Sequence, residues 1–327
     1  MDYKEIKKLF VKRKNIIITT HKSPDGDALG SSLALYHLFK KNHKVNVIVP
    51  NDYPVYLKWL PSNDEVLNYE IDKKKSDKLI HDADIIFYLD FNKIHRTLQM
   101  ENSLSNSSAI KILIDHHEEP DIDCDFLISN SNISSTAELV YDFILKIDKT
   151  INRNIASCIY TGILTDTGSF KYPNVSSKTH EIISNLLNYK INHSNIHQKL
   201  FDSQSKSRFK LLNIFIKNLS FLNDDKIAFS FLYESDLKCC KFAKGDTEGF
   251  VNFPLSLSSV KFSAFFVQFE DGIKLSFRSQ GKIDVNAFAK KYFNGGGHKN
   301  ASGGFFSHRN LSEVLNLFKD KATKLKC

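Results

Sequence analysis

The stretch 15-NIIITTHKSPDGDALGSS-32 decides the fold of the first half of this 327-residue chain. It opens with an apolar run of the kind that forms a strand buried on both faces of a sheet. His21, Asp25 and Asp27 follow within seven residues, and a helical pattern runs from about Ala28. Burying charged side chains at the end of a strand costs free energy unless they are paired, so a metal ion, a cationic partner or solvent must lie beside them.

Three more apolar runs continue the pattern set by the first, and helical segments separate them. They are 44-KVNVIVP-50, 83-ADIIFYLD-90 and 110-IKILID-115. Apolar runs that alternate with helices favour a doubly wound, mainly parallel α/β sheet. The first half of the chain is therefore expected to be an α/β domain of this type.

The second half of the chain has a different pattern. Residues 177–222 are predicted to be wholly helical apart from the polar stretch 202-DSQSKS-207, which is expected to act as a hinge. Strand-like runs and two helices then indicate a smaller mixed α/β domain. The predicted organisation is a catalytic domain at 1–195, a helical linker at 196–214 and a substrate domain at 215–327, with the active site in the cleft between the domains.

Composition adds further limits on the class of protein. The formal charge of +8 comes with a general richness in lysine, and no single basic stripe dominates, so it indicates a solvated lysine-rich surface. No apolar run approaches the roughly 20 residues that span a bilayer, so a cytoplasmic protein without membrane attachment is expected. The cysteines show neither zinc nor disulfide spacing; they are Cys124, Cys158, Cys239, Cys240 and Cys327.

Metal-type ligands follow three of the four predicted strands. In an open parallel sheet, ligands bind beyond the carboxyl ends of the strands, so these side chains are expected to meet at one edge. A further carboxylate ends the helical pattern at 153–166. The predicted metal ligands are His21, Asp25, Asp27, Asp90, His116 and Asp166.

Two imidazoles and four carboxylates suit manganese or magnesium better than structural zinc. Four carboxylates neutralise two divalent cations, and a pair of ions can activate water for in-line phosphoryl displacement. Asp90, alone at a central strand end, is the expected bridge between the ions. Simpler roles stay open at this point: Asp27 as a helix N-cap, Asp115 as a group that orients an imidazole, and His117 as a substrate contact or a packing residue.

Four segments together resemble the motifs of the DHH phosphoesterase superfamily. They are 21-HKSPDGDALGS-31, 88-YLDFNKIHR-96, 112-ILIDHH-117 and 161-TGILTDTGSF-170. The C-terminal 277-FRSQGKIDVNAFAKKYFNGGGHKNASGG-304 resembles the glycine-rich end of the associated DHHA1 domain. The resemblance covers nearly the whole chain.

The resemblance implies roles for these residues. Those that match His21, Asp25 and Asp90 bind one metal ion, and those that match Asp27, Asp90, His116 and Asp166 bind the other. Two manganese ions are the usual cofactors, with magnesium or cobalt as possible replacements. The catalytic group implied is Asp90 together with the DHH motif itself, which consists of Asp115, His116 and His117.

The glycine-rich segment and two arginines are the expected substrate contacts. Glycines allow a backbone turn to approach an anion closely, and an arginine binds phosphate in a bidentate manner. In the family the matching segment holds the phosphate or nucleotide end of the substrate. The residues concerned are Arg96, Arg278, Ser279, Gly295, Gly296, Gly297 and His298.

Several activities share such a site, and the architecture separates them. Family II pyrophosphatases carry another second domain, RecJ-type exonucleases carry additional domains, and membrane-tied phosphodiesterases add transmembrane segments. The compact two-domain group that remains degrades very short RNA and converts pAp, a bisphosphorylated adenosine, to AMP. Alternatives are a linear or cyclic dinucleotide phosphodiesterase (pApA or pGpG type) and a non-catalytic nucleotide- or RNA-binding protein. Expected partners are short RNA, pAp or dinucleotides, with a possible homodimer.

Overall fold

The chain divides into two compact units in the computed structural model, which describes residues 3–147, 149–307 and 310–325. The first unit extends to Ser203 and the second begins at Gln204. This division falls inside the stretch that was expected to link two domains. The limits 1–195, 196–214 and 215–327 stay predictions.

The first unit is built on a six-stranded sheet in which every pair of neighbouring strands is parallel. Its strands lie in the order β3-β2-β1-β4-β5-β6. They are β1 (Asn15–Thr20), β2 (Lys44–Val49), β3 (Val66–Asn68), β4 (Ile85–Leu89), β5 (Ile110–Asp115) and β6 (Phe126–Ser129). The expected doubly wound sheet is confirmed, and the strand order changes direction between β1 and β4.

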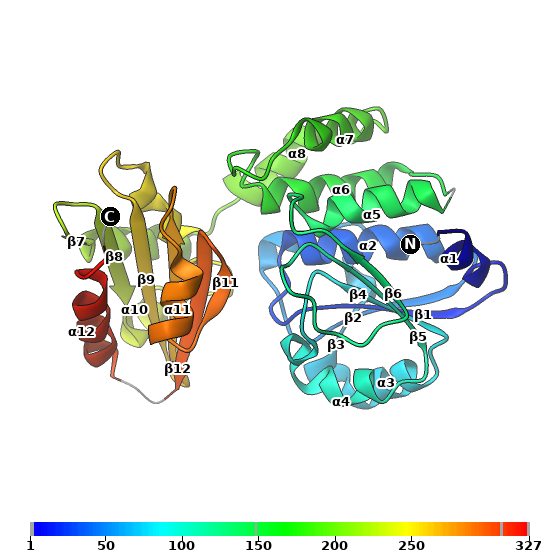
Figure 1. The fold of residues 1–327 in the computed structure, drawn as a ribbon, viewed down its shortest axis with the longest axis horizontal. Coiled ribbons are helices and arrows are strands. Elements are labelled where there is room, and N and C mark those ends of the chain that lie inside the picture. Colours follow the sequence, from blue (N-terminus) through cyan, green and yellow to red (C-terminus); the bar gives the residue numbers. More distant parts are fainter. Residues whose placement is uncertain (1–2, 148, 308–309, 326–327) are drawn as a thin grey trace. The chain divides into compact units, whose positions relative to one another are not determined.

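Helices cover both faces of this sheet (Figure 1). One face carries α2 (Gly26–Phe39), α5 (Thr136–Lys146) and α6 (Arg153–Asp166), and the other carries α3 (Tyr69–His81) and α4 (Glu101–Ser105). The unit also contains α1 (Tyr3–Leu9), α7 (Ser177–Leu187) and α8 (His193–His197). Because strand side chains alternate, Ile16 and Ile18 enter the core under α2 while Ile17 enters the core on the α3 side.

Two glycines let α2 and α6 pack with their backbones close together. A Cβ atom at Gly30 would lie 2.5 Å from the carbonyl oxygen of Cys158, and one at Gly162 would lie 2.9 Å from Oδ1 of Asp27. These distances are below those of real Cβ contacts. The close approach places the last turn of α6, which ends at Asp166, beside the first turn of α2.

The second unit is built on a mixed six-stranded sheet in the order β11-β12-β10-β9-β8-β7. Strands β8 and β9 run parallel, and the other neighbouring pairs run antiparallel. Its strands are β7 (Ser220–Leu222), β8 (Ile227–Leu232), β9 (Phe262–Phe269), β10 (Gly272–Ser279), β11 (Gly296–His298) and β12 (Ala301–Ser307). Its helices are α9 (Lys206–Lys217), α10 (Glu234–Cys239), α11 (Val285–Tyr292) and α12 (Leu311–Ala322). The expected mixed α/β domain is confirmed.

The sequence patterns did not define β3 or α3, and the expectation of helix throughout 177–222 is wrong at Ser220–Leu222, which form β7. Strand β3 has only three residues, which is too short for a periodic signal. Helix α3 is mostly polar and buries only Tyr69, Ser76 and Ile80, so its apolar face is too narrow to be recognised.

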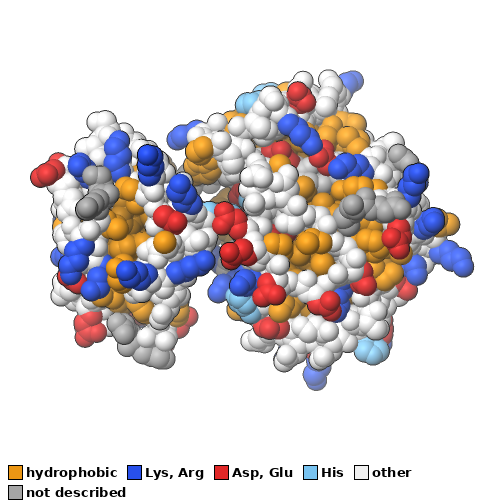
Figure 2. Space-filling view, in the orientation of Figure 1, with side chains coloured by type: hydrophobic (Ala, Val, Ile, Leu, Met, Phe, Trp, Pro, Cys, Tyr) orange, Lys and Arg blue, Asp and Glu red, His pale blue; other side chains and the backbone are white. Residues whose placement is uncertain are grey.

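Two structural observations concern the distribution of charge and the length of the apolar helices. On the face drawn in Figure 2, lysine and arginine side chains are scattered over both units with acidic side chains among them. Within the described part of the chain, no helix has the length and apolar character needed to cross a membrane. A cytoplasmic location stays a prediction.

Gly30→Ala is predicted to lower the free energy of unfolding by about 1–3 kcal/mol, because overpacking at a tight backbone contact outweighs the higher helix propensity of alanine. Urea unfolding measures the change. Ser184→Ala, at an exposed position of α7, is the matched control and is expected to leave stability nearly unchanged. Equal stability of Gly30→Ala and wild type would contradict the close packing of α2 on α6.

Candidate metal centre

Six predicted ligands meet at the carboxyl edge of the first sheet. His21 follows β1, Asp90 follows β4, and His116 follows β5. Asp25 and Asp27 lie at the start of α2, and Asp166 is the last residue of α6. Strands β1 and β4 are neighbours at the point where the strand order reverses, and this is where open α/β sheets bind their ligands.

His21 is oriented as a metal-binding histidine would be. Its Nδ1 lies 2.8 Å from the carbonyl oxygen of Lys22, so Nδ1 carries the proton and donates it. Its Nε2 faces the carboxylates, 3.4 Å from Oδ2 of Asp90 and 4.0 Å from Oδ2 of Asp25. Nε2 therefore faces the place where these carboxylates converge, where it can donate to them when protonated or offer its lone pair to a cation.

Asp90 is buried at the centre of the group. Its Oδ2 lies 3.4 Å from Nε2 of His21, and its Oδ1 lies 3.4 Å from Nε2 of His116. The backbone of Asp90 has a φ of 66°, which is uncommon for a residue with a side chain and marks local strain. One carboxylate thus faces two histidines that come from two different strands.

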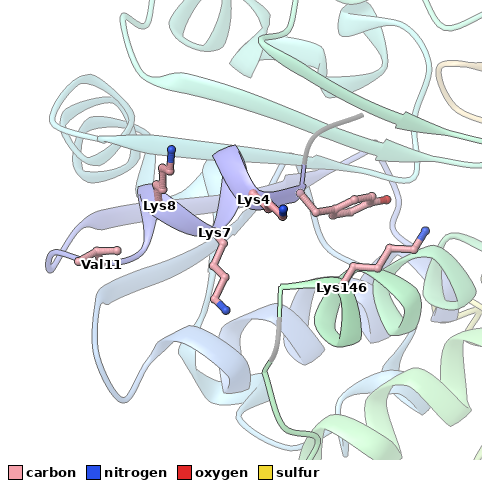
Figure 3. Close-up of a pocket in the computed structure, with 6 residues that line it drawn as sticks. Lys4, Lys7, Lys8, Val11 and Lys146 are labelled. Carbon is pink, nitrogen blue, oxygen red and sulfur yellow. The ribbon is translucent and has the colours of Figure 1, made fainter.

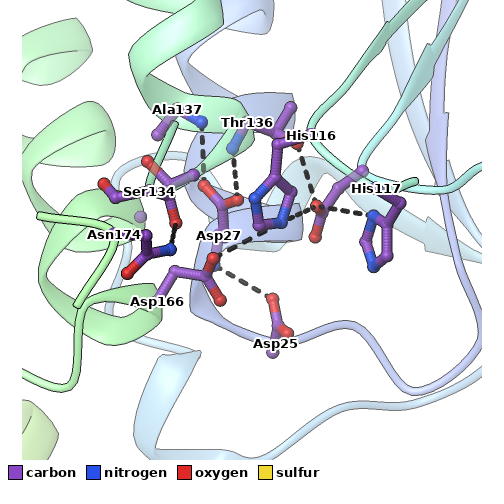
Figure 4. A network of polar contacts seen from close by, with 12 residues as sticks. Asp25, Asp27, His116, His117, Ser134, Thr136, Ala137, Asp166 and Asn174 are labelled. Carbon is purple, nitrogen blue, oxygen red and sulfur yellow. Dashed lines mark hydrogen bonds and ion pairs between the residues drawn. The ribbon is translucent and has the colours of Figure 1, made fainter. Parts of the chain in front are cut away.

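Asp27 lies within α2, and the alternative that it serves as an N-cap is wrong. The N-cap is Asp25, whose side chain accepts hydrogen bonds from the backbone of Asp27 and Ala28, and α2 begins at Gly26, two residues before the expected start. The carboxylate of Asp27 instead accepts from the backbone N–H groups of Thr136 at 2.7 Å and Ala137 at 2.9 Å (Figure 4). Those groups are unpaired donors of the first turn of α5.

His116 and Asp166 complete the second half of the group. Nε2 of His116 lies 3.4 Å from Oδ2 of Asp166, at the end of α6 (Figure 4). One nitrogen therefore faces carboxylates from β4 and α6. Asp27, Asp90 and His116 each offer one ligand atom, and these atoms lie within 4.8 Å of one another, as do those of His21, Asp25 and Asp90.

Asp115 and His117 form a chain of hydrogen bonds with Arg96, which lies in the 3-10 helix Ile94–Met100. Arginine can only donate, so Nη1 of Arg96 donates to Nε2 of His117 at 3.1 Å. Nδ1 of His117 then carries the proton and donates to Oδ1 of Asp115 at 2.7 Å. Asp115 therefore orients the imidazole of His117. Orientation of an imidazole was one of the roles that the sequence left open for Asp115.

Burial and crowding oppose ionisation of several carboxylates. Burial and the charges of Asp90 and Asp166 raise the pKa of Asp27 well above its usual range. Burial raises the pKa of Asp166 to about 8, with help from Asp25 and Asp90 and against the pull of His116. Burial also opposes ionisation of Asp90, yet the hydrogen bond to His21 and the charges of His117 and His116 hold its pKa below the usual value.

The residues present fit the binding of divalent cations. Oδ2 of Asp115 is buried and has no hydrogen-bond partner among the described residues, and a buried unpaired carboxylate oxygen is costly. Carboxylates that are crowded to the point of protonation become favourable when a cation lies between them. The donor set of imidazole nitrogens and carboxylate oxygens suits manganese or magnesium.

The predicted substrate contacts of the second unit have structural partners. Nη1 of Arg278 donates to the carbonyl oxygen of Phe277 at 2.9 Å, and the hydroxyl of Ser279 donates to the carbonyl oxygen of Ile283 at 2.7 Å. Ser279 also accepts from Nδ2 of Asn300 at 2.8 Å. These bonds fix the end of β10 against the loops that follow it.

Part of the glycine cluster forms a short strand, and binding of an anion by this segment stays a prediction. Gly296, Gly297 and His298 form β11, which pairs with β12. A Cβ atom at Gly295 would lie 2.0 Å from the carbonyl oxygen of Gly303, so this glycine is required by the close approach of two backbones. A Cβ atom at Gly296 would lie 3.8 Å from Oδ1 of Asn286, which is ordinary van der Waals contact, so no close approach requires a glycine there.

Thr136 and Gly162 are supporting residues that the sequence patterns missed. The hydroxyl of Thr136 donates to Oδ1 of Asp90 at 2.9 Å. A Cβ atom at Gly162 would lie 2.9 Å from Oδ1 of Asp27. A hydroxyl at a helix start and a glycine inside a helix are too common to mark a site by themselves.

A cavity of about 370 Å³ lies away from the metal-ligand group (Figure 3). It is lined by residues of α1, by Val11 and by Lys146 at the end of α5. Because α1 leads into the amino end of β1, this cavity is at the opposite edge of the sheet. None of its lining residues belongs to the predicted site.

Comparisons with known proteins agree with the sequence motifs. The model of the DHH family, N-terminal domain, matches residues 15–163, and the model of the DHHA1 domain matches residues 224–324. A bifunctional oligoribonuclease and PAP phosphatase, NrnA, from Bacillus subtilis is 29% identical over 292 residues, 88% of each chain. A probable NrnA from Streptococcus mutans is 30% identical over 313 residues, 95% of each chain.

A solved structure is similar along nearly the whole chain. It is the crystal structure of an exopolyphosphatase-related protein from Bacteroides fragilis, which is 41% identical with a TM-score of 0.92. The match covers 97% of this chain and 94% of the other. The two proteins thus have the same fold.

Asp166→Asn is predicted to flatten the pH dependence of stability of the metal-free protein. A carboxyl whose pKa is about 8 in the folded state and near 4 in the unfolded state favours folding in its neutral form, so stability falls as pH rises from about 4 to 8. Melting temperatures in a chelator between pH 5 and 8.5 measure this loss. The slope is expected to be smaller in Asp166→Asn; equal slopes in the two proteins would contradict the raised pKa.

Proposed function

This chain belongs to the DHH family of phosphoesterases and carries a DHHA1 domain, and we propose that it hydrolyses very short oligoribonucleotides to nucleoside monophosphates. The same site removes the 3′-phosphate of pAp and leaves AMP. The relatives from Bacillus subtilis and Streptococcus mutans support this proposal, because both activities are part of their names.

One observation carries the proposal: the two carboxylate oxygens of Asp90 face different histidines, at 3.4 Å in each case. A carboxylate in this orientation suits a bridge between two cations. His21, Asp25 and Asp90 hold one cation in the proposal. Asp27, Asp90, His116 and Asp166 hold the other.

Two manganese ions are the proposed cofactors, with magnesium or cobalt as possible replacements. When bound, such ions supply Lewis acidity to a phosphoester and lower the pKa of water. The chain holds its ligands before any ion arrives, because Asp27 is fixed by the start of α5 and His21 by the carbonyl of Lys22. Fixed ligands need little reorganisation on binding.

The hydrogen-bond chain beside the ligands has a positioning role in the proposed reaction. Asp115 holds His117 with its proton on Nδ1, and Nε2 of His117 accepts from Arg96. The guanidinium of Arg96 is thereby held near Asp90, where it can donate its remaining N–H groups to a substrate phosphate. Asp90, Asp115, His116 and His117 form the proposed catalytic group.

Residues of the second unit are the proposed contacts for the phosphate or nucleotide end of the substrate. Arg278 and His298 supply donors, and Gly295, Gly296 and Gly297 let the backbone of this segment approach the ligand. Ser279 contributes by fixing the end of β10, on which Arg278 lies. Gly295 and Gly297 also allow the close packing of β11 on β12.

The purified protein with Mn²⁺ is predicted to hydrolyse a two-nucleotide RNA, a five-nucleotide RNA and pAp, and to leave pyrophosphate intact. The reason is that the chain belongs with two-domain relatives whose names include both RNA and pAp activities. Product formation in parallel assays, with a chelator control, is the measurement. Turnover of pyrophosphate alone, or of none of the four, would reject this substrate class.

Asp90→Asn is predicted to lower kcat/KM by at least about 100-fold, since losing only an outer partner of a metal ligand already costs 10–100-fold. Asparagine keeps the size of aspartate and tolerates positive φ, so the fold is expected to survive. Steady-state kinetics with Mn²⁺ measures the loss. Asp123→Asn, at a fully exposed side chain, is the matched control. Full activity of Asp90→Asn would refute the bridging assignment.

A further inference from the structure

Three consecutive hydroxyl residues lead into helix α5, which begins at the third of them, and they have different partners. Ser134 bonds through its hydroxyl to the carboxylate of Glu138, and Ser135 is the N-cap, whose Oγ accepts from the backbone N–H of Glu138 at 3.3 Å. The hydroxyl of Thr136 instead leaves the helix and donates to Oδ1 of Asp90 at 2.9 Å. Thr136 is therefore the member of the trio that contacts the metal-ligand group.

Thr136 holds two carboxylates at the same time. Its backbone N–H donates to Oδ2 of Asp27 at 2.7 Å, while its hydroxyl donates to Asp90. Figure 4 shows Thr136 beside both Asp27 and His116, at the start of the helix. All of these side chains are buried, with relative exposures of 0% for Thr136, 1% for Asp27 and 2% for Asp90. The two bonds tie together strand β4, helix α2 and helix α5.

The bond to Asp90 selects one rotation of its carboxylate. The terminal torsion of aspartate is broad, so backbone and packing alone leave the two oxygens free to turn. Because the hydroxyl of Thr136 holds Oδ1 on the side of His116, Oδ2 is left facing His21. This rotation is the one in which Asp90 can serve two cations.

We propose that Thr136 is a positioning residue that locks the carboxylate of Asp90 in the bridging orientation. The inference rests on the proposed two-metal function and deepens it, because it names the group that makes one carboxylate available to both ions. Thr136 is not a ligand in this proposal. It acts only through Asp90 and Asp27.

A purely helical role for Thr136 predicts a different behaviour. A residue in the first turn needs its backbone N–H for Asp27, and every residue except proline provides one. If that were its whole role, valine would replace threonine without effect on metal binding. The hydroxyl is thus the feature to test.

The experiment compares Thr136→Val, which removes the hydroxyl at nearly constant shape, with Thr136→Ser, which keeps it. Mn²⁺ is titrated into each metal-free protein by calorimetry, and the spectrum of the protein with two Mn²⁺ per chain is recorded by electron paramagnetic resonance. Thr136→Val is expected to bind Mn²⁺ about 10–100-fold more weakly and to lose the coupled two-manganese signal. Thr136→Ser is expected to retain both properties.

The melting temperature of each metal-free protein reports whether it folds. If Thr136→Val does not fold, Thr136→Ala provides the same test, because it lacks the hydroxyl and cannot overpack. A folded variant without the hydroxyl that binds Mn²⁺ as wild type does would overturn the inference, and so would an equal loss in Thr136→Ser. Failure of the wild-type protein to bind Mn²⁺ would instead overturn the proposed function itself.

Discussion

Repulsion among buried carboxylates at one edge of the first sheet is the constraint on which the rest of the site depends. Asp27, Asp90 and Asp166 come from a helix start, a strand end and a helix end, and burial opposes the ionisation of all three. A fold collects such groups only if it supplies donors to them, or if a cation joins them. Here the donors are the first turn of α5 and the imidazoles of His21 and His116.

The packing of helices makes this collection of charges possible. Gly162 allows α6 to approach Ala137 and Asp27, and a Cβ atom at Gly26 would lie 2.4 Å from the hydroxyl oxygen of Thr165. Larger residues at these positions would move the end of α6, and with it Asp166, away from α2. The position of one proposed metal ligand therefore depends on glycines that are not themselves among the proposed ligands.

Asp90, the candidate bridge between the cations, has a positive φ, and this backbone conformation costs free energy. Strain of this kind persists only where the surroundings fix the residue, and here β4, Thr136 and two histidines do so. The hydrogen bonds from Arg96 to His117 and from His117 to Asp115 fix these side chains in the same way. The site is thus organised by hydrogen bonds before any cation is considered.

The sequence by itself determined most of the parallel sheet and the six candidate ligands, because apolar runs set the longer strands and ligand types follow their carboxyl ends or lie at the ends of helices. It could not show that Asp25 caps α2 while Asp27 binds the start of α5, because that partner is more than 100 residues away. Nor could it identify Thr136, or show that Gly296 and Gly297 pair within a sheet. Those contacts depend on which segments meet in space, and only the tertiary structure decides that.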